Sequence, residues 1–340
     1  MVTLPEILLF SMAEEREKVI EAEISQVKER APSIEGVKLI TCVPMFVIVS
    51  LKKTEQKHLT ANLQFPPNYP NEQIVVELKS KTLSDKLLYG LTNVCDQETK
   101  KWVGQKQVMV MINFIMNFME ENPLCICSDE ISDIKKKMLS DCDDLKLKQK
   151  SSQLVFRICQ NNYHMSFVLS VPEFYPSVQI GIEVGDYNFP ELLKTHFQAN
   201  AVEIARKCVQ PPLKKNSKEP PFKPAPSLKP VCEFLINDCI KKYPQEVCPV
   251  CTDRCLPTSP GEKLSGGRQV ERVYCGHIFH HGCLRKYMKT PPFTGGKKCP
   301  SCGKQIFHQK WRITPELAEA RWAHKQARQR ELEEVVDFLD

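Results

Sequence analysis

The chain has 340 residues, of which 42% are hydrophobic and 26% charged, and its formal net charge is +6. A chain of this length and apolar content is expected to form two or three domains with real cores, which excludes wholesale disorder. The longest uncharged apolar run near the middle, Val108–Met119, holds 12 residues, whereas a membrane-spanning helix needs about 20. The first residues have neither the basic leader nor the cleavage site of a signal peptide. We therefore expect a cytoplasmic or nuclear protein without a membrane segment.

Cysteines and charges are unevenly distributed along the chain. Seven of the 16 cysteines lie between Cys248 and Cys302, and four of them form two pairs whose members are separated by two residues, which is a metal-ligand spacing rather than a disulfide pattern. Residues 1–247 carry 31 basic and 31 acidic side chains, and residues 248–340 carry 16 and 10. The excess of positive charge therefore belongs to the C-terminal part.

The first two thirds of the chain contain an internal repeat at an offset of 106 residues. Residues 59–78 align with residues 165–184 at seven identities in 20 positions, and Tyr69-Pro70 aligns with Tyr175-Pro176. Each copy predicts a strand, a proline-bounded loop and a second strand, because apolar residues alternate with polar ones. The flanking sequence predicts a leading helix at 5–30, preceding strands at 45–53 and 154–160, and closing helices at 108–122 and 231–243.

This order of helix, antiparallel strands and helix is typical of an α+β sandwich layer. With Tyr-Pro in the loop after the third strand, it resembles the RWD domain, a relative of the ubiquitin-conjugating-enzyme fold. The resemblance implies two tandem RWD-like sandwich domains, at residues 1–124 and 129–245. In the second domain we expect the charged stretch 129–150 to form the leading helix. Seven prolines between Pro211 and Pro230 predict an exposed loop over 209–230.

Cys95 is a candidate nucleophile, because conjugating enzymes carry ubiquitin as a thioester on a cysteine at a similar distance from the tyrosine. It lies 26 residues after Tyr69 and seven before Trp102. The His-Pro-Asn stretch that stabilises the oxyanion in those enzymes is absent, and residues 86–93 predict a helix in its place. We therefore expect Cys95 to be a buried structural thiol, and we expect no catalytic side chain in this chain.

The C-terminal cysteines and histidines form a long metal-binding pattern. A Cys-Pro-Val-Cys pair is followed after 23 residues by Cys-Gly-His-Ile-Phe-His-His-Gly-Cys, and after 15 more by Cys-Pro-Ser-Cys. Cysteine and histidine suit tetrahedral zinc, and a gap of two residues lets both sulfurs of a pair reach one ion. Eight ligands imply two Zn²⁺ ions. His281 competes with His280 as a ligand, and Cys255 is a surplus thiol.

Every gap in this pattern resembles the RING finger, and treble-clef, PHD and LIM modules are the alternatives. The RING resemblance implies a small cross-brace zinc domain over residues 246–312. It assigns one ion to Cys248, Cys251, His280 and Cys283, and the other to Cys275, His277, Cys299 and Cys302. Both sites would be structural, because four protein ligands leave no position for water. A C-terminal helix is expected over 314–340, where Thr314 and Pro315 form a good helix start.

Nucleic acid is not an expected partner, although residues 248–313 hold 12 basic and three acidic side chains. Negative zinc-thiolate centres explain part of this basic character. These basic residues are not accompanied by a basic helix with interleaved aromatic residues, which is a sequence pattern of nucleic-acid binding.

The resemblance implies a RING-type E3 ubiquitin ligase or ligase subunit, which docks a ubiquitin-charged conjugating enzyme and promotes transfer to a substrate lysine without a covalent intermediate. The docking positions carried over are Val250, Leu284, Phe293 and Pro300. Core packing is the alternative role for each of them, and for Leu284 it is the favoured one. Many active RING domains have an arginine directly after the last ligand, where this chain has Gly303.

The RWD-like domains would recruit substrate or partner subunits. The whole layout resembles RWD-containing RING ligases, among them the Fanconi anaemia ubiquitin ligase subunit. A non-catalytic adaptor that uses its zinc module for protein binding is the alternative function.

Overall fold

The computed structural model describes residues 4–212, 221–262, 264–306 and 314–339. Parts of the predicted segments lie outside these ranges: 1–3 of the first domain, 213–220 of the proline-rich loop, 263 and 307–312 of the zinc domain and residue 340 of the last helix. The chain divides into two compact units. The first comprises Met1–Phe156, Phe167–Glu183 and Gln198–Glu233, and the second comprises Arg157–Ser166, Val184–Phe197 and Phe234–Asp340. In the described ranges no helix has both the length and the apolar composition that crossing a membrane requires.

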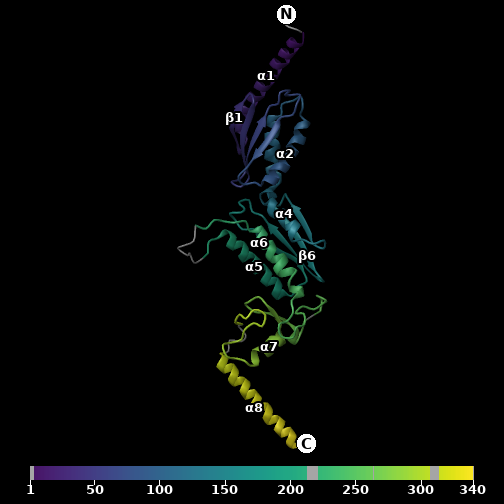
Figure 1. The fold of residues 1–340 in the computed structure, drawn as a ribbon, viewed down its shortest axis with the longest axis vertical. Helices are drawn as coiled ribbons and strands as arrows, with labels where there is room; N and C mark the ends of the chain where they lie inside the picture. Colours follow the sequence, from purple (N-terminus) through teal and green to yellow (C-terminus); the bar gives the residue numbers. More distant parts are fainter. Residues whose placement is uncertain (1–3, 213–220, 263, 307–313, 340) are drawn as a thin grey trace. The chain divides into compact units, whose positions relative to one another are not determined.

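The N-terminal domain consists of a long helix, a four-stranded sheet and two further helices (Figure 1). The sheet has the order β1-β2-β3-β4, and every neighbouring pair is antiparallel. The elements are α1 (Leu4–Arg30), β1 (Val37–Val43), β2 (Phe46–Lys52), β3 (His58–Gln64), β4 (Val75–Lys79), α2 (Asp85–Lys100) and α3 (Val108–Glu121).

One hydrophobic core fills this domain. On β4, Val76 and Leu78 are buried, as the alternating sequence predicts. The apolar helix α3 contributes Met111 and Ile115 to the same core, because a helix with so few polar residues is stable only when it is covered. Cys95 of α2 also belongs to this core, and burial raises the pKa of its thiol to about 12. Residues 86–93 are helical, as predicted, and form part of α2.

A buried carboxylate connects α1 to the start of α3. Glu23 is fully buried and accepts a hydrogen bond from the hydroxyl of Tyr69. Its Oε1 also accepts the backbone N–H groups of Gln107 and Val108, at 2.8 and 2.7 Å. Amides at the start of a helix have no acceptor within the helix, so the carboxylate satisfies them. Burial raises the pKa of Glu23 above its ordinary value, and these donors partly oppose the rise. We call these four residues the first latch.

The same order of elements recurs after α3 (Figure 1). The second sheet has the order β5-β6-β7-β8. The elements are η2 (Pro123–Cys127), α4 (Ser128–Lys137), β5 (Asp144–Lys148), β6 (Gln153–Gln160), β7 (Tyr163–Ser170), β8 (Gly181–Tyr187), α5 (Glu191–Val209), α6 (Leu228–Glu233) and η3, a π-helix (Phe234–Ile240).

Two elements of this second copy differ from the prediction. The charged stretch 129–150 does not form one helix, since α4 ends at Lys137 and β5 follows. In β5, Leu145 and Leu147 are half-buried and alternate with exposed charged residues, which is a strand pattern. The helix α5 was not predicted. Between Pro221 and Ser227 the chain has no regular secondary structure.

The second copy repeats the latch with different residues. Glu130 of α4 accepts a hydrogen bond from the hydroxyl of Tyr175 at 2.5 Å and from the backbone N–H of Lys229 at 2.9 Å. The N–H of Leu228 donates to the Tyr175 hydroxyl at 3.1 Å. Burial raises the pKa of Glu130, as it does for Glu23. We call these four residues the second latch. Its backbone N–H groups belong to the first residues of α6, just as those of the first latch lie at the start of α3.

The second compact unit contains the C-terminal module with its cysteines and histidines. Its regular elements are η4 (Tyr243–Gln245), η5 (Gly266–Arg268), β9 (Val270–Arg272), β10 (Ile278–His280), α7 (His281–Lys289) and α8 (Pro315–Leu339), and β9 pairs antiparallel with β10. A row of rings runs from Tyr163 through Phe189 and Phe197 to Tyr243, with centroids 5.0, 5.6 and 5.0 Å apart. The Tyr243 hydroxyl donates to the carbonyl of Gly276 at 3.3 Å. The module therefore packs on strand and helix ends within its own unit.

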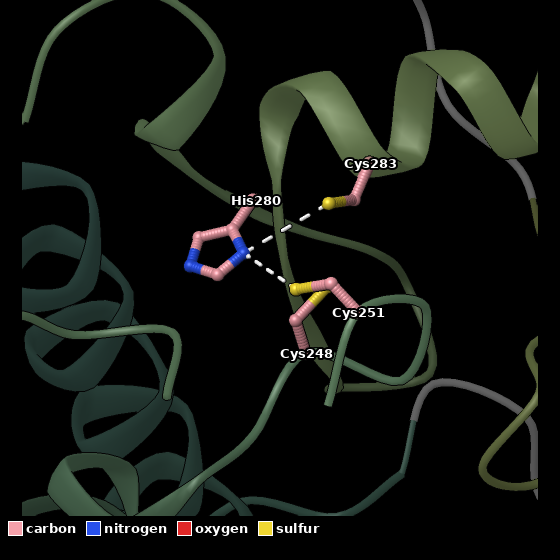
Figure 2. Close-up of side chains that lie close together, drawn as sticks. All are labelled: Cys248, Cys251, His280 and Cys283. Atoms are coloured by element: carbon pink, nitrogen blue, oxygen red, sulfur yellow. Dashed lines mark hydrogen bonds between the residues drawn. The ribbon is translucent and has the colours of Figure 1, made fainter. Parts of the chain in front are cut away.

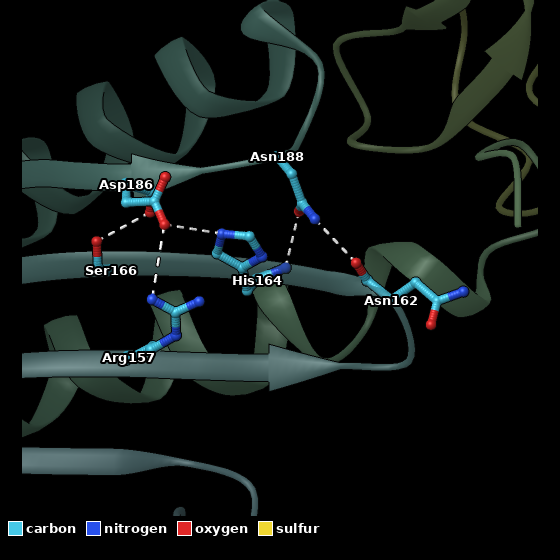
Figure 3. A network of polar contacts seen from close by, with 6 residues as sticks. All are labelled: Arg157, Asn162, His164, Ser166, Asp186 and Asn188. Carbon is cyan, nitrogen blue, oxygen red and sulfur yellow. Dashed lines mark hydrogen bonds and ion pairs between the residues drawn. The ribbon is translucent and has the colours of Figure 1, made fainter. Parts of the chain in front are cut away.

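A polar network at one end of β7 and β8 also holds this module (Figure 3). The backbone N–H of His164 donates to the Asn188 side chain, whose amide donates to the carbonyl of Asn162, both at 2.8 Å. The imidazole of His164 lies 3.0 Å from a carboxylate oxygen of Asp186. From this fixed turn, the side-chain amide of Asn162 donates to the carbonyl of Thr258 at 2.9 Å. Thr258 lies in the loop that separates the first Cys pair from the central ligands, so the network fixes one side of that loop.

Candidate metal centre

The two Cys-Pro-x-Cys segments fold into matching hairpin turns. An isolated antiparallel bridge closes each of them, between Val247 and Arg254 and between Lys298 and Gln305. The residue after the second cysteine adopts a left-handed conformation in both, with φ of 64° at Thr252 and 69° at Gly303. This tight turn points both sulfurs of a pair to the same side, as a shared ion requires.

The first ligand group brings one cysteine pair together with His280, the last residue of β10, and Cys283 of α7 (Figure 2). The Nδ1 atom of His280 lies 3.2 Å from the sulfur of Cys251 and 3.9 Å from that of Cys283. The Nε2 atom lies 3.1 Å from the carbonyl oxygen of Arg254. A hydrogen bond from Nε2 to this carbonyl leaves the lone pair on Nδ1, facing the sulfurs, which is the tautomer that a metal ligand needs. Cys248 completes this group.

The second group brings the other cysteine pair together with the central ligands. It consists of Cys275, His277, Cys299 and Cys302. The Nδ1 atom of His277 lies 3.4 Å from the sulfur of Cys275 and 3.6 Å from that of Cys299. The two groups alternate along the sequence, which is the interleaved arrangement of a cross-brace.

The donor chemistry of both groups fits zinc. In each group all four ligand atoms lie within 4.8 Å of one another, and tetrahedral Zn–S bonds of about 2.3 Å place sulfurs about 3.8 Å apart. Burial raises the pKa of Cys275 to about 11 and that of Cys283 to about 12. A divalent cation would reverse this shift, because it stabilises the thiolate directly, so metal binding would release protons. With four protein ligands each, both sites would have a structural role.

Two other candidate ligands lie outside these groups. The Nδ1 atom of His281 lies 3.0 Å from a carboxylate oxygen of Glu271, so its ring is directed to that partner. Cys255 is buried, and its thiol donates to the carbonyl of Ile278 at 3.4 Å. Burial raises the pKa of Cys255 well above its ordinary value. This geometry selects His280 over His281 for the first group.

The four residues carried over as docking positions fall into two classes. Val250 is 37% exposed, and Pro300 is exposed as well. Leu284 and Phe293 are 0% and 5% exposed, so both are core residues of the module in this structure.

Tyr287 is a surface candidate that the sequence analysis did not single out. The ring is partly exposed on α7, and its hydroxyl donates to the carbonyl of Lys298 at 2.7 Å. The ammonium of the buried Lys297 lies 4.6 Å from the Tyr287 centroid and 5.2 Å from that of Phe293. Such cation–π contacts are strongest where water is excluded, so Lys297 holds the Tyr287 ring in one position. Its place four residues after Cys283, on a short helix, was the available signal.

Gly303 occupies the position after the last ligand. No atom lies within 4 Å of where a Cβ would stand on it, so the space beside this position is open. The equivalent residue of the first turn, Thr252, shows that a residue with a side chain tolerates this backbone conformation.

Comparison with known proteins gives local similarity only. No family model matches the chain. It is 33% identical over 61 residues to the ERAD-associated E3 ubiquitin-protein ligase HRD1 of Eremothecium gossypii, a match that covers 18% of this chain and 9% of that protein. It is also 33% identical over 64 residues to the E3 ubiquitin-protein ligase RNF4 of Homo sapiens, which covers 19% of this chain and 28% of that protein. The chain thus spans less than a third of the length of either relative. This partial similarity and the two Cys/His groups fit a RING, and they indicate a RING-type, ligase-like function.

Proposed function

We propose that the chain is a RING-type E3 ubiquitin ligase or ligase subunit that holds two structural Zn²⁺ ions. The observation that carries this proposal is the interleaved pair of four-ligand groups, at RING spacing, in a chain whose local relatives are ubiquitin ligases. The partners would be a ubiquitin-conjugating enzyme and its ubiquitin. Sixteen free cysteines suit a reducing compartment, the cytosol or the nucleus.

The two N-terminal α+β domains are proposed to be RWD-like and to recruit substrate or partner subunits, in a layout like that of the Fanconi anaemia ligase subunit. The repeated order of one helix, four strands and closing helices supports this assignment. So do the two latches, which both use the repeated tyrosine. Cys95 lies in the core with a raised thiol pKa, which suits a structural role and not thioester formation.

Catalysis by this module would consist of positioning. A conjugating enzyme would dock on Val250, Pro300 and Tyr287, and the restrained thioester would then be attacked by a substrate lysine. Because the buried Lys297 contacts the rings of both Tyr287 and Phe293, this surface would be pre-organised, which reduces the entropy lost on docking. No side chain of the chain itself would exchange a covalent bond with ubiquitin.

A non-catalytic adaptor is the second candidate, and Gly303 favours it. The family's arginine at this position donates hydrogen bonds to enzyme and ubiquitin together, and glycine cannot. Lys304 follows, but an ammonium does not reproduce the planar fork of donors that a guanidinium provides.

The decisive experiment is ubiquitin discharge to free lysine from a panel of charged conjugating enzymes. Val250→Asp should abolish discharge with zinc still bound, because docking would strand a carboxylate in an apolar interface. Val247→Asp is the matched control, since Val247 is also exposed, at 47%, and lies just outside the same turn. Discharge that is absent with every enzyme, in a protein that holds two ions, would refute the ligase and leave the adaptor.

A further inference from the structure

A basic groove lies between α7 and α8, apart from the proposed docking surface. Its volume is about 660 Å³. The cations lining it are Arg285, Lys286 and Lys289 of α7 and Arg321 and Lys325 of α8. None of the residues proposed to dock the conjugating enzyme lines it.

Helical spacing explains why these side chains converge. On α7 the lining residues Gly282, Arg285, Lys286 and Lys289 recur at intervals of three and four, which places them on one face. On α8 the same intervals select Ala318, Arg321, Trp322 and Lys325.

Apolar groups are present between the cations. The indole of Trp322 is half-buried, and Ala318 and Met288 also line the groove. An aromatic ring next to guanidinium and ammonium groups offers a flat surface to an apolar side chain of a partner. The groove therefore combines positively charged and apolar lining residues.

The five cations have no partner of opposite charge in the described part of the chain. No ion pair within the described ranges involves them, and no carboxylate is among the lining residues. Clustered like charges repel one another, and a cleft lined by one sign of charge attracts ligands of the other. This geometry is expected of a site that receives an anionic ligand.

We propose that the groove binds an acidic protein segment that carries an apolar residue, with its carboxylates on the five cations and the apolar side chain on Trp322. The charge pattern of α8 favours a short acidic segment over nucleic acid. The basic stretch 321–330 is bounded by Glu316 and Glu319 before it and by Glu331 and Glu333 after it. These carboxylates would repel a phosphate backbone that continues past the groove, because such a backbone carries one charge per nucleotide along its whole length.

The test is a titration of the zinc-loaded full chain with a fluorescein-labelled synthetic peptide, rich in glutamate and aspartate around one leucine, followed by anisotropy. Saturable binding that weakens with salt is expected. The double change Arg321→Glu and Lys325→Glu should weaken it by at least about 10-fold, because two attractive contacts become repulsive. Trp322→Ala should weaken it without changing its salt dependence, since this change removes only the apolar contact.

The matched control is the double change Arg328→Glu and Arg330→Glu. It alters net charge equally on the same helix, outside the groove, and should change affinity by less than about threefold. Zinc content is measured for each variant to verify folding. An equal loss in both double variants would overturn the proposal in favour of non-specific attraction. It would also be overturned if a single-stranded DNA probe bound more tightly with the same dependence on Arg321, or if the wild type self-associated through this residue in sedimentation experiments.

Discussion

Replacement of Glu23 tests whether the first latch holds α3 in place. In Glu23→Ala, three buried donors lose their acceptor: the Tyr69 hydroxyl and the N–H groups of Gln107 and Val108. Each hydrogen bond to a charged acceptor contributes about 1.5–3 kcal/mol. Three effects reduce the sum. The Tyr69 hydroxyl retains a second acceptor, the Gln105 carbonyl at 3.3 Å, and the Gln107 N–H retains the Tyr69 oxygen at 3.2 Å. Loss of the carboxylate also removes its desolvation cost, which is the main cause of its raised pKa. We expect a loss of about 3–4 kcal/mol.

Glu23→Gln separates acceptor geometry from charge. The amide oxygen can still accept both backbone N–H groups, and the amide NH2 can donate to the oxygen of Tyr69. We therefore expect a loss of only about 1 kcal/mol. The assay is native-state hydrogen exchange of peptides that cover α3, with peptides from β9 and β10 of the second unit as the internal control. The reasoning would be refuted by a loss below about 1 kcal/mol in Glu23→Ala, or by equal losses in the two variants.

Four further predictions concern the second ligand group, Cys95, Gly303 and the pH dependence of stability. Cys299→Ser should reduce zinc content from two ions to one or none and remove exchange protection in α7, while α3 keeps its protection, because metal binding and folding of the module are coupled. Cys95→Ala should cost about 1–2 kcal/mol of stability and leave ubiquitin discharge unchanged, and no reducible ubiquitin adduct should form on the wild type. Gly303→Arg should accelerate discharge severalfold in a lysine-discharge assay, at a cost of about 1 kcal/mol for a side chain at positive φ. The folded-state pKa of Glu23 is raised above its ordinary value of 4.5, so the part of its contribution to stability that depends on protonation is fully present below that value and is lost as the pH rises through the folded pKa, while its hydrogen bonds remain. Urea unfolding from about pH 4 to about pH 7 should show this slope in the wild type and a flatter one in Glu23→Gln.

Each of these has an outcome that would contradict it. Two bound ions in Cys299→Ser would mean that the second group is not a metal site. A thioester on Cys95 would make the first domain a conjugating enzyme. Unchanged discharge in Gly303→Arg, in a protein that still holds two ions, would show that the missing side chain does not limit activity. Identical pH slopes with and without the Glu23 carboxylate would assign the effect to other groups.

The sequence predicted those parts of the fold whose pattern is local. Alternating apolar residues predicted β4, and the apolar run from Val108 predicted α3, because in both cases one face or the whole element must be covered. The strand β5 was missed, since its three charged residues alternate with only two leucines, and pairing with β6 decides its conformation. Glu23 and Glu130 carry no local signal at all. A glutamate on a helix is usually solvated, and only the folded chain shows the amides that it binds.

The metal-ligand groups could be foreseen because ligand chemistry restricts residue type and spacing. The sequence could not predict in the same way which of the apolar docking positions are buried. Val250, Leu284 and Phe293 are all apolar, yet only Val250 is exposed, because the side of a short turn or helix that faces the core depends on the neighbouring elements. Tyr287 was overlooked for the same reason, since its support comes from Lys297, ten residues along the chain.

The two latches also show where this fold accepts extra chain. The glutamate and the tyrosine are separated by 46 residues in the first copy and 45 in the second, so the strands between them fix that length. From the tyrosine to the amide that meets its hydroxyl, the separation is 38 residues in one copy and 53 in the other. The two copies therefore differ in length by one residue before the tyrosine and by 15 residues after it. Residues 221–226, which are exposed and without regular structure, lie in this permissive interval. An affinity tag or a protease cleavage site inserted there should leave both latches and both Cys/His groups undisturbed.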